Sequence, residues 1–236
     1  MKCAFGENPK RCYKDKNNYS RMSTAAKLRE LLFKTQEYAA KLQAAGDDLS
    51  KKPPFDFKLE AMLPVIRREI PLKAHAHRAD DIFTALRIAK EFNVRITLEH
   101  VTDGSLIVEE LAKENVMLAV GPSFGHRTKF ELKNKSFRTP GDLANAGCHV
   151  SIITDAPVIP QQYLRLCAGL AVKEGMKEFD ALKAITINAA EHAGVADRVG
   201  SIEVGKDADI VIMDGCLFES LSNVVATYID GKKVFG

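Results

Sequence analysis

Two histidines and one aspartate occupy positions at which a metal site could be built. His75, His100 and Asp155 each end or closely follow a short apolar run that we predict to be a β-strand. Because the carboxyl ends of parallel strands meet at one edge of a sheet, we expect the three side chains to lie close together. Two imidazoles and a carboxylate suit a divalent metal such as zinc and leave one position for water.

A divalent metal at this edge of the sheet would supply hydrolytic chemistry. It would lower the pKa of its bound water to about 7 and polarise the carbonyl group of a substrate. A neighbouring carboxylate would then move protons between the water and the leaving group. A single histidine near a strand end is more often a structural residue, so the hypothesis depends on the shared position of all three.

The elements that would position these residues alternate along the chain. Apolar runs predict strands at residues 2–5, in a run ending at 75, and at 94–98, 116–120 and 149–153. Helical spacing predicts helices at 23–50, 59–68, 80–92, 105–114, 141–146, 161–174 and 178–193. Ser23 is the expected cap of the first helix. Alternation at this spacing predicts βαβ units and a parallel sheet, either open or closed into a barrel.

The last 36 residues have a different pattern. Four short strands are predicted there, at 201–204, 209–213, 224–229 and 232–235. Asp230-Gly231 lies between the last two, and an Asp-Gly pair between β-rich runs is a strong hairpin signal. We therefore expect a small antiparallel unit at the C-terminal end.

Composition excludes several classes of protein. Lys and Arg number 34 against 31 for Asp and Glu, a net charge of +3 that is too small to predict a nucleic-acid or membrane-surface partner. No apolar run approaches the ~18 residues of a membrane-spanning helix. The five cysteines form no C-x-x-C pair, which favours free thiols and a cytoplasmic location. The N-terminal residues contain no apolar stretch typical of a secretory signal.

Several segments resemble a known family. PLKAHAHRADDI, LEHVTDG and VSIITDAPV resemble the amidohydrolase superfamily of metal-dependent hydrolases, in particular its imidazolonepropionase-like and prolidase-like branches. SIEVGKDADIVIMDG and VVATYIDGKKVFG are similar to the C-terminal β-strands of that family. The resemblance covers residues 70–236 well and residues 1–69 more loosely.

The resemblance implies an α/β fold built on an incomplete TIM-type (β/α) barrel. We expect a partial barrel over residues 1–199 and a remnant of the small β-domain over residues 200–236. Five candidate barrel strands are present where a closed barrel has eight. The H-x-H pair of the family's first strand does not precede residue 75. The chain therefore resembles the C-terminal part of a larger enzyme, and its open sheet edges favour a homo-oligomer.

The resemblance also assigns roles to the residues at the strand ends. It makes His75 a metal ligand, His100 a metal ligand or a substrate contact, and Asp155 both a ligand and the proton shuttle. His77 would share a face with His75 only if the strand continued that far. Otherwise His77 would contact the substrate from a loop.

Other charged residues are weaker candidates. Glu7 or Lys2 would supply a further metal ligand, because some relatives use a glutamate or a carboxylated lysine from an earlier strand. Arg127 and Lys129 lie in the loop after the fourth predicted strand, where they would bind a substrate carboxylate. A solvated surface role remains the simpler interpretation of all four.

Two functions are consistent with these features. The first is a metal-dependent hydrolase that attacks an amide or cyclic amide C–N bond of a small molecule with metal-activated water. Zinc is the expected metal, with iron or manganese as alternatives. The second is a non-catalytic truncated fragment or remnant of such an enzyme, acting as an oligomeric structural or binding module, so the catalytic status of this chain stays open.

Overall fold

Five strands form one sheet in the order of the chain. The structure, a computed structural model, describes residues 1–236. The sheet order is β1-β2-β3-β4-β5, and the pairs β1/β2 and β4/β5 are parallel. The strands are β1 (Lys2–Ala4), β2 (Leu72–Ala76), β3 (Ile96–His100), β4 (Met117–Val120) and β5 (His149–Ile152).

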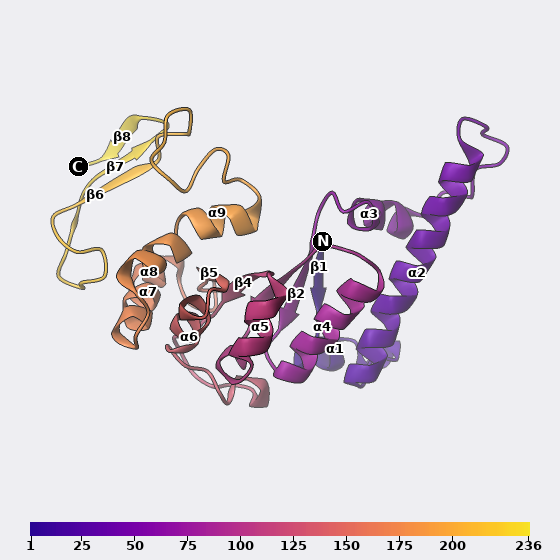
Figure 1. Cartoon of the computed structure of the whole chain (residues 1–236), viewed down its shortest axis with the longest axis horizontal. Helices are drawn as coiled ribbons and strands as arrows, with labels where there is room; N and C mark the ends of the chain where they lie inside the picture. Colours follow the sequence, from indigo (N-terminus) through magenta and orange to yellow (C-terminus); the bar gives the residue numbers. More distant parts are fainter. The chain divides into compact units, whose positions relative to one another are not determined.

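Nine α-helices connect and follow these strands (Figure 1). They are α1 (Glu7–Cys12), α2 (Arg21–Ala45), α3 (Phe57–Ile66), α4 (Ala79–Glu91), α5 (Val108–Glu114), α6 (Thr139–Asn145), α7 (Leu164–Lys173), α8 (Glu178–Ala184) and α9 (Ile187–Ala193). The strand and helix positions agree with the predicted alternation to within about five residues, apart from α1, which the sequence did not predict, and the differences described below. None of the helices is long and apolar enough to cross a membrane.

The chain divides into two compact units, Met1–Leu98 and Glu99–Gly236. The division falls inside β3, so this strand belongs to both. In the first unit, α2 packs against α3 and α4, and Leu32, Leu72 and Ile82 are fully buried. In the second unit, α7 and α8 pack together and against β5. The core there contains Ile152, Cys167, Ala168, Ala171, Met176, Ala181 and Ala184.

The N-terminus of α2 differs from the expected one. Ser20, not Ser23, is the cap, and it accepts a hydrogen bond from the backbone N–H of Ser23 at 3.0 Å. The hydroxyl of Ser23 accepts in return from the N–H of Ser20 at 3.1 Å. This reciprocal capping box satisfies two backbone donors that the helix itself leaves open, which explains the earlier start.

The expected helix over residues 178–193 is two helices. It breaks at Ile185 and Thr186, where Thr186 leaves the helical conformation with φ −129° and ψ −101°. The run Ile185-Thr186-Ile187 is entirely β-branched, and such side chains fit a helix poorly. The Thr186 hydroxyl also donates to the carbonyl of Leu182 at 2.7 Å, a bond that competes with regular helix geometry.

The small sheet formed by the last 36 residues has three strands where the sequence predicts four. β6 (Ile210–Met213), β7 (Val224–Ile229) and β8 (Lys232–Phe235) form an antiparallel sheet. Asp230 and Gly231 both have positive φ, 48° and 73°, as a two-residue hairpin turn requires, so the predicted hairpin is confirmed.

The predicted strand over residues 201–204 is absent. The Ser201 hydroxyl donates to Glu203, and the amine of Lys206 donates to Ser201. The polar side chains of this segment therefore bond to one another. Such local bonds compete with strand pairing. Elsewhere in the chain, all five cysteines are free thiols, as expected.

Candidate metal centre

His75 and His77 lie side by side at the end of β2. Residues two apart on a strand share a face, and this relation holds although the strand ends at Ala76. Their ring centroids are 4.8 Å apart with the rings nearly perpendicular. Both side chains are buried. The structure therefore brings together the two residues of the H-A-H segment.

His100 ends β3 and is fixed by a backbone carbonyl. Its Nδ1 lies 2.7 Å from the carbonyl oxygen of Gly121, the first residue after β4. A carbonyl oxygen can only accept, so Nδ1 carries the hydrogen and the neutral ring has its lone pair on Nε2. A hydrogen bond of this kind orients metal-ligating histidines and fixes their tautomer.

The three histidines form one group. One ring nitrogen of each lies within 4.8 Å of the others, and all three residues are buried. Buried imidazoles at this spacing are a donor set that suits zinc and other divalent transition metals. The chemistry of the group therefore fits a metal ion. His75 and His100 were expected here, and the structure adds His77 to the group.

Asn8 is a neighbour that the sequence did not indicate. Its amide nitrogen lies 3.4 Å from Nε2 of His75, because β1 leads directly into α1 at the same edge of the sheet. Glu7 begins α1, half-buried, and lies outside the histidine group. Lys2 is exposed at the opposite end of β1, where it pairs in register with Lys73. Its position puts it away from the histidines.

Asp155 also lies outside the histidine group. It follows β5 with a positive φ of 53° and is exposed. In the sheet order, β4 separates β5 from β3, and two strand spacings amount to about 10 Å. Its roles as metal ligand and proton shuttle therefore stay predictions.

The two basic loop residues proposed for substrate binding have other partners. Arg127 donates from Nη2 to the carbonyl of Lys135 at 2.9 Å. The amine of Lys129 lies 3.6 Å from Oε1 of Glu131, whose side chain is fully buried. Lys129 is thus tied to a carboxylate of its own loop.

The sequence model of the amidohydrolase family matches residues 53–234. The chain belongs to the amidohydrolase family. Among curated proteins, it is 31% identical over 152 residues to an imidazolonepropionase of Bacteroides fragilis, an alignment covering 58% of this chain and 33% of that protein. It is 24% identical to the amidohydrolase tasK of Hapsidospora irregularis over its whole length, which is 25% of that protein. The aligned regions thus cover a third or less of these two relatives.

A solved amidohydrolase structure shares the fold. The chain superposes on an amidohydrolase from Thermotoga maritima with a TM-score of 0.93 and 42% identity, over 99% of this chain and 62% of that one. An adenosine deaminase from Xanthomonas campestris, at 23% identity and a TM-score of 0.52, shares the fold alone. The fold is thus an incomplete TIM-type barrel of α/β class, with five strands in sheet order where a closed barrel has eight.

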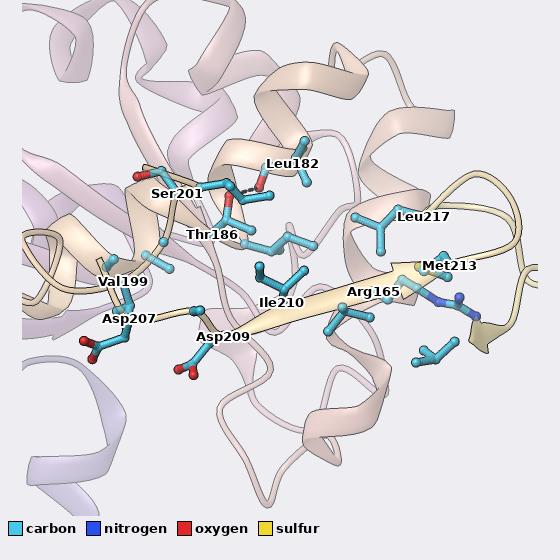
Figure 2. A pocket seen from close by; sticks show the side chains of 18 of the residues that line it. Arg165, Leu182, Thr186, Val199, Ser201, Asp207, Asp209, Ile210, Met213 and Leu217 are labelled. Carbon is cyan, nitrogen blue, oxygen red and sulfur yellow. Dashed lines mark hydrogen bonds between the residues drawn. The ribbon is translucent and has the colours of Figure 1, made fainter. Parts of the chain in front are cut away.

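A large cavity of the second unit lies elsewhere. It has a volume of about 1320 Å³ and is lined by residues of β6, α8 and α9 and the loops beside them (Figure 2). None of the three histidines lines it. Its lining polar groups serve the fold: Arg165 donates to the carbonyl of Ser222 at 2.9 Å, and Asp207 pairs with Arg198. The histidine group is the stronger candidate for chemistry.

Proposed function

We propose that the chain is part of a metal-dependent amidohydrolase that cleaves an amide or cyclic amide C–N bond of a small molecule. The observation that carries the proposal is the group of three buried imidazoles, each with a nitrogen within 4.8 Å of the others. The match to the amidohydrolase family supports a hydrolytic reaction. The imidazolonepropionase relatives support a cyclic amide as one substrate class.

Each residue of the histidine group would have a defined role in metal binding. His75, His77 and His100 would hold a divalent ion, zinc first and iron or manganese as alternatives. The ion would supply water activation and carbonyl polarisation. Gly121 keeps His100 in the tautomer whose Nε2 can ligate.

The outer residues of the site are proposed on position alone. Asp155 follows β5 at the same edge and would carry protons, and Glu7 begins α1 beside Asn8. Arg127 is the more available of the two basic loop residues for a substrate carboxylate, because Lys129 is paired with Glu131. We keep the division into a partial barrel over 1–199 and a β-unit over 200–236 as a proposal.

A non-catalytic role is the second candidate. It is favoured by the exposed position of Asp155 outside the histidine group. In that case the chain would retain the histidines and bind metal without turnover. Metal content and turnover together separate the two functions.

The decisive experiment is metal analysis of protein purified without chelator or added metal. We expect about one ion per chain. His75→Ala, His77→Ala and His100→Ala should each weaken zinc binding more than about 100-fold in a competition titration with a chelator. The reason is that even a residue that only orients a ligand contributes 10–100-fold.

A matched control is available on the surface. His149 is partly exposed and hydrogen-bonded to Glu191, so His149→Ala should leave zinc binding unchanged. Zinc binding that survives all three cluster substitutions would refute the metal centre. Hydrolysis of amides or lactams by the loaded protein would support the enzyme, whereas bound metal without turnover would favour the non-catalytic role.

A further inference from the structure

The segment between β4 and α6 is strongly basic. Residues 121–138 contain five lysines and arginines and a single acidic residue, Glu131. The basic residues are Arg127, Lys129, Lys133, Lys135 and Arg138. Such an excess of one sign in 18 residues needs either solvent or counter-charges to offset it.

Three of the five basic side chains have local partners or an aromatic face. Lys129 lies 3.6 Å from Glu131, and Arg138 lies 3.5 Å from Asp142 at the start of α6. The amine of Lys133 lies 4.8 Å from the centre of the Phe130 ring. These three residues are explained by the structure of the segment itself.

Arg127 and Lys135 have carbonyl partners but no carboxylate. Lys135 is 9% exposed, and its amine donates to the carbonyl of Phe124 at 2.8 Å. Arg127 donates to the carbonyl of Lys135. No acidic group forms an ion pair with either within 4.0 Å. A buried ammonium has three donors, and a single carbonyl leaves most of its charge without compensation.

The two cations line a cavity of about 610 Å³ together with His126. This volume lies within the range of small-molecule binding pockets. Glu174 is the acidic residue of the lining, and it makes no ion pair with the cations. Phe124, whose ring lies 6.3 Å from that of Phe137, supplies an apolar wall.

The pKa of the Lys135 amine is lowered by its surroundings. Burial lowers the pKa of its amine, and the positive charge of Arg127 lowers the pKa further. Both causes mean that the charged amine is disfavoured without a counter-ion. A bound anion would offset the repulsion between the two cations. It would also accept hydrogen bonds from those N–H groups of Arg127 and Lys135 that do not bond to backbone carbonyls.

We propose that the cavity formed by His126, Arg127 and Lys135 is a binding site for an anionic group of carboxylate or phosphate chemistry. The group has two possible sources, the carboxylate of an amide substrate or a free anion. Position supports the first source, because the same segment begins at Gly121, whose carbonyl contacts His100. Binding of the anion itself does not depend on the metal chemistry proposed above.

The test uses calorimetric titration of the metal-free chain with three probes. N-acetylglycine carries a carboxylate, N-acetylglycinamide is its neutral counterpart, and inorganic phosphate represents a free anion. Lys135→Met and Arg127→Met should each weaken anion binding about tenfold or more, since each removes a charged hydrogen-bond donor to the anion. Lys133→Met is the matched control, because it removes the same charge from the same segment outside the cavity.

Every outcome decides the proposal. Binding of N-acetylglycine, of phosphate or of both, weakened in the two cavity variants and unchanged in Lys133→Met, supports it and identifies the source. Because Lys135 is buried, Lys135→Met could misfold, and Arg127→Met then provides an independent test. Circular dichroism checks the fold of both variants. Equal binding of N-acetylglycinamide, no anion binding, or full affinity in both variants overturns it. Anion binding that disappears in His75→Ala would place the anion at the histidines and also overturn it.

Discussion

At the scale of single residues, the position of His100 depends on a glycine. Gly121 has a φ of +136°, and a Cβ at this position would lie 2.3 Å from the carbonyl oxygen of Ile153. No other residue fits without moving the backbone that accepts the hydrogen bond of His100. The glycine is therefore part of the site although its side chain has no chemistry.

Gly121→Ala should lower both stability and zinc affinity. We expect a loss of about 2–4 kcal/mol in the free energy of unfolding, from backbone strain together with the clash. Chemical denaturation and zinc titration measure the two effects. Gly147→Ala is the control, because Gly147 has a φ of +88° with no atom within 4 Å of the added Cβ. It should cost about 1–2 kcal/mol and leave zinc affinity unchanged. Equal effects of the two substitutions would contradict the role of Gly121.

Sequence analysis predicted part of the site, for a physical reason. His75 and His100 could be placed because strand ends of a parallel sheet converge, whatever the exact bounds of the strands. His77 could not, because its face depends on whether the extended backbone continues for one more residue. Asn8 gave no signal, since its proximity to His75 follows from the pairing of β1 with β2 across about 70 residues of chain.

At the scale of elements, a buried ion pair connects α2 to α4. Nε of Arg21 lies 3.0 Å from both carboxylate oxygens of Asp81, which is 2% exposed. Burial raises the pKa of Asp81, and the charge of Arg21 opposes this rise. The positive charge of Arg21 therefore stabilises the ionised form of Asp81 at neutral pH.

Arg21→Met should destabilise the protein by about 1–3 kcal/mol at pH 8, because it leaves a buried carboxylate without its cation. Denaturant unfolding measures the loss. Arg29→Met, which removes an exposed pair with Glu91 from the same helix, should cost less than about 1 kcal/mol. Adding Asp81→Asn to Arg21→Met should restore part of the stability. No recovery in the double variant would show that packing, not charge, causes the loss.

The same pair predicts a pH dependence. Asp81 binds its proton more tightly in the folded than in the unfolded chain, since its pKa is raised from 3.8. Its contribution to stability is therefore largest at low pH and is lost as the pH rises through the folded pKa. Arg21→Met removes the opposing charge, with Arg78 and Asp80 still nearby. The deficit of the variant relative to wild type should thus be smaller at pH 5 than at pH 8. A deficit that grows on acidification would contradict this sign.

The positions of elements were predictable where local pattern decides them. The alternation of strands and helices follows from apolar periodicity, so it was predicted throughout residues 71–193. The break at Thr186 and the closed segment around Ser201 depend on single side-chain hydrogen bonds, which periodicity does not report. The capping box at Ser20 is readable in principle, because Ser20 and Ser23 have the spacing of such a box.

At the scale of the whole molecule, the C-terminal sheet exposes apolar side chains. In β6–β8, the exposed apolar residues are Val211, Ile212, Val224, Val225, Ile229, Val234 and Phe235. Exposed apolar side chains on a sheet favour an interface. We therefore expect the chain to associate with further copies through this sheet.

Val225→Lys should weaken this association about tenfold or more, because a buried valine contributes about 1.5–3 kcal/mol. Size-exclusion chromatography with light scattering, over a range of concentrations, gives the mass. Val204→Lys is the control, since Val204 is exposed in a turn outside the sheet. A wild-type chain that is monomeric at all concentrations would refute the expectation.

The carbonyl of Gly121 has a further consequence for ligand binding. It contacts His100 at one end of the segment whose later residues line the basic cavity. If an anion shifts this segment, the orientation of the imidazole changes with it, and the affinity of the histidines for metal changes by some factor. Thermodynamic reciprocity then requires the metal to change the affinity of the anion by the same factor. Two ligands with no atom in common would regulate each other through one peptide group.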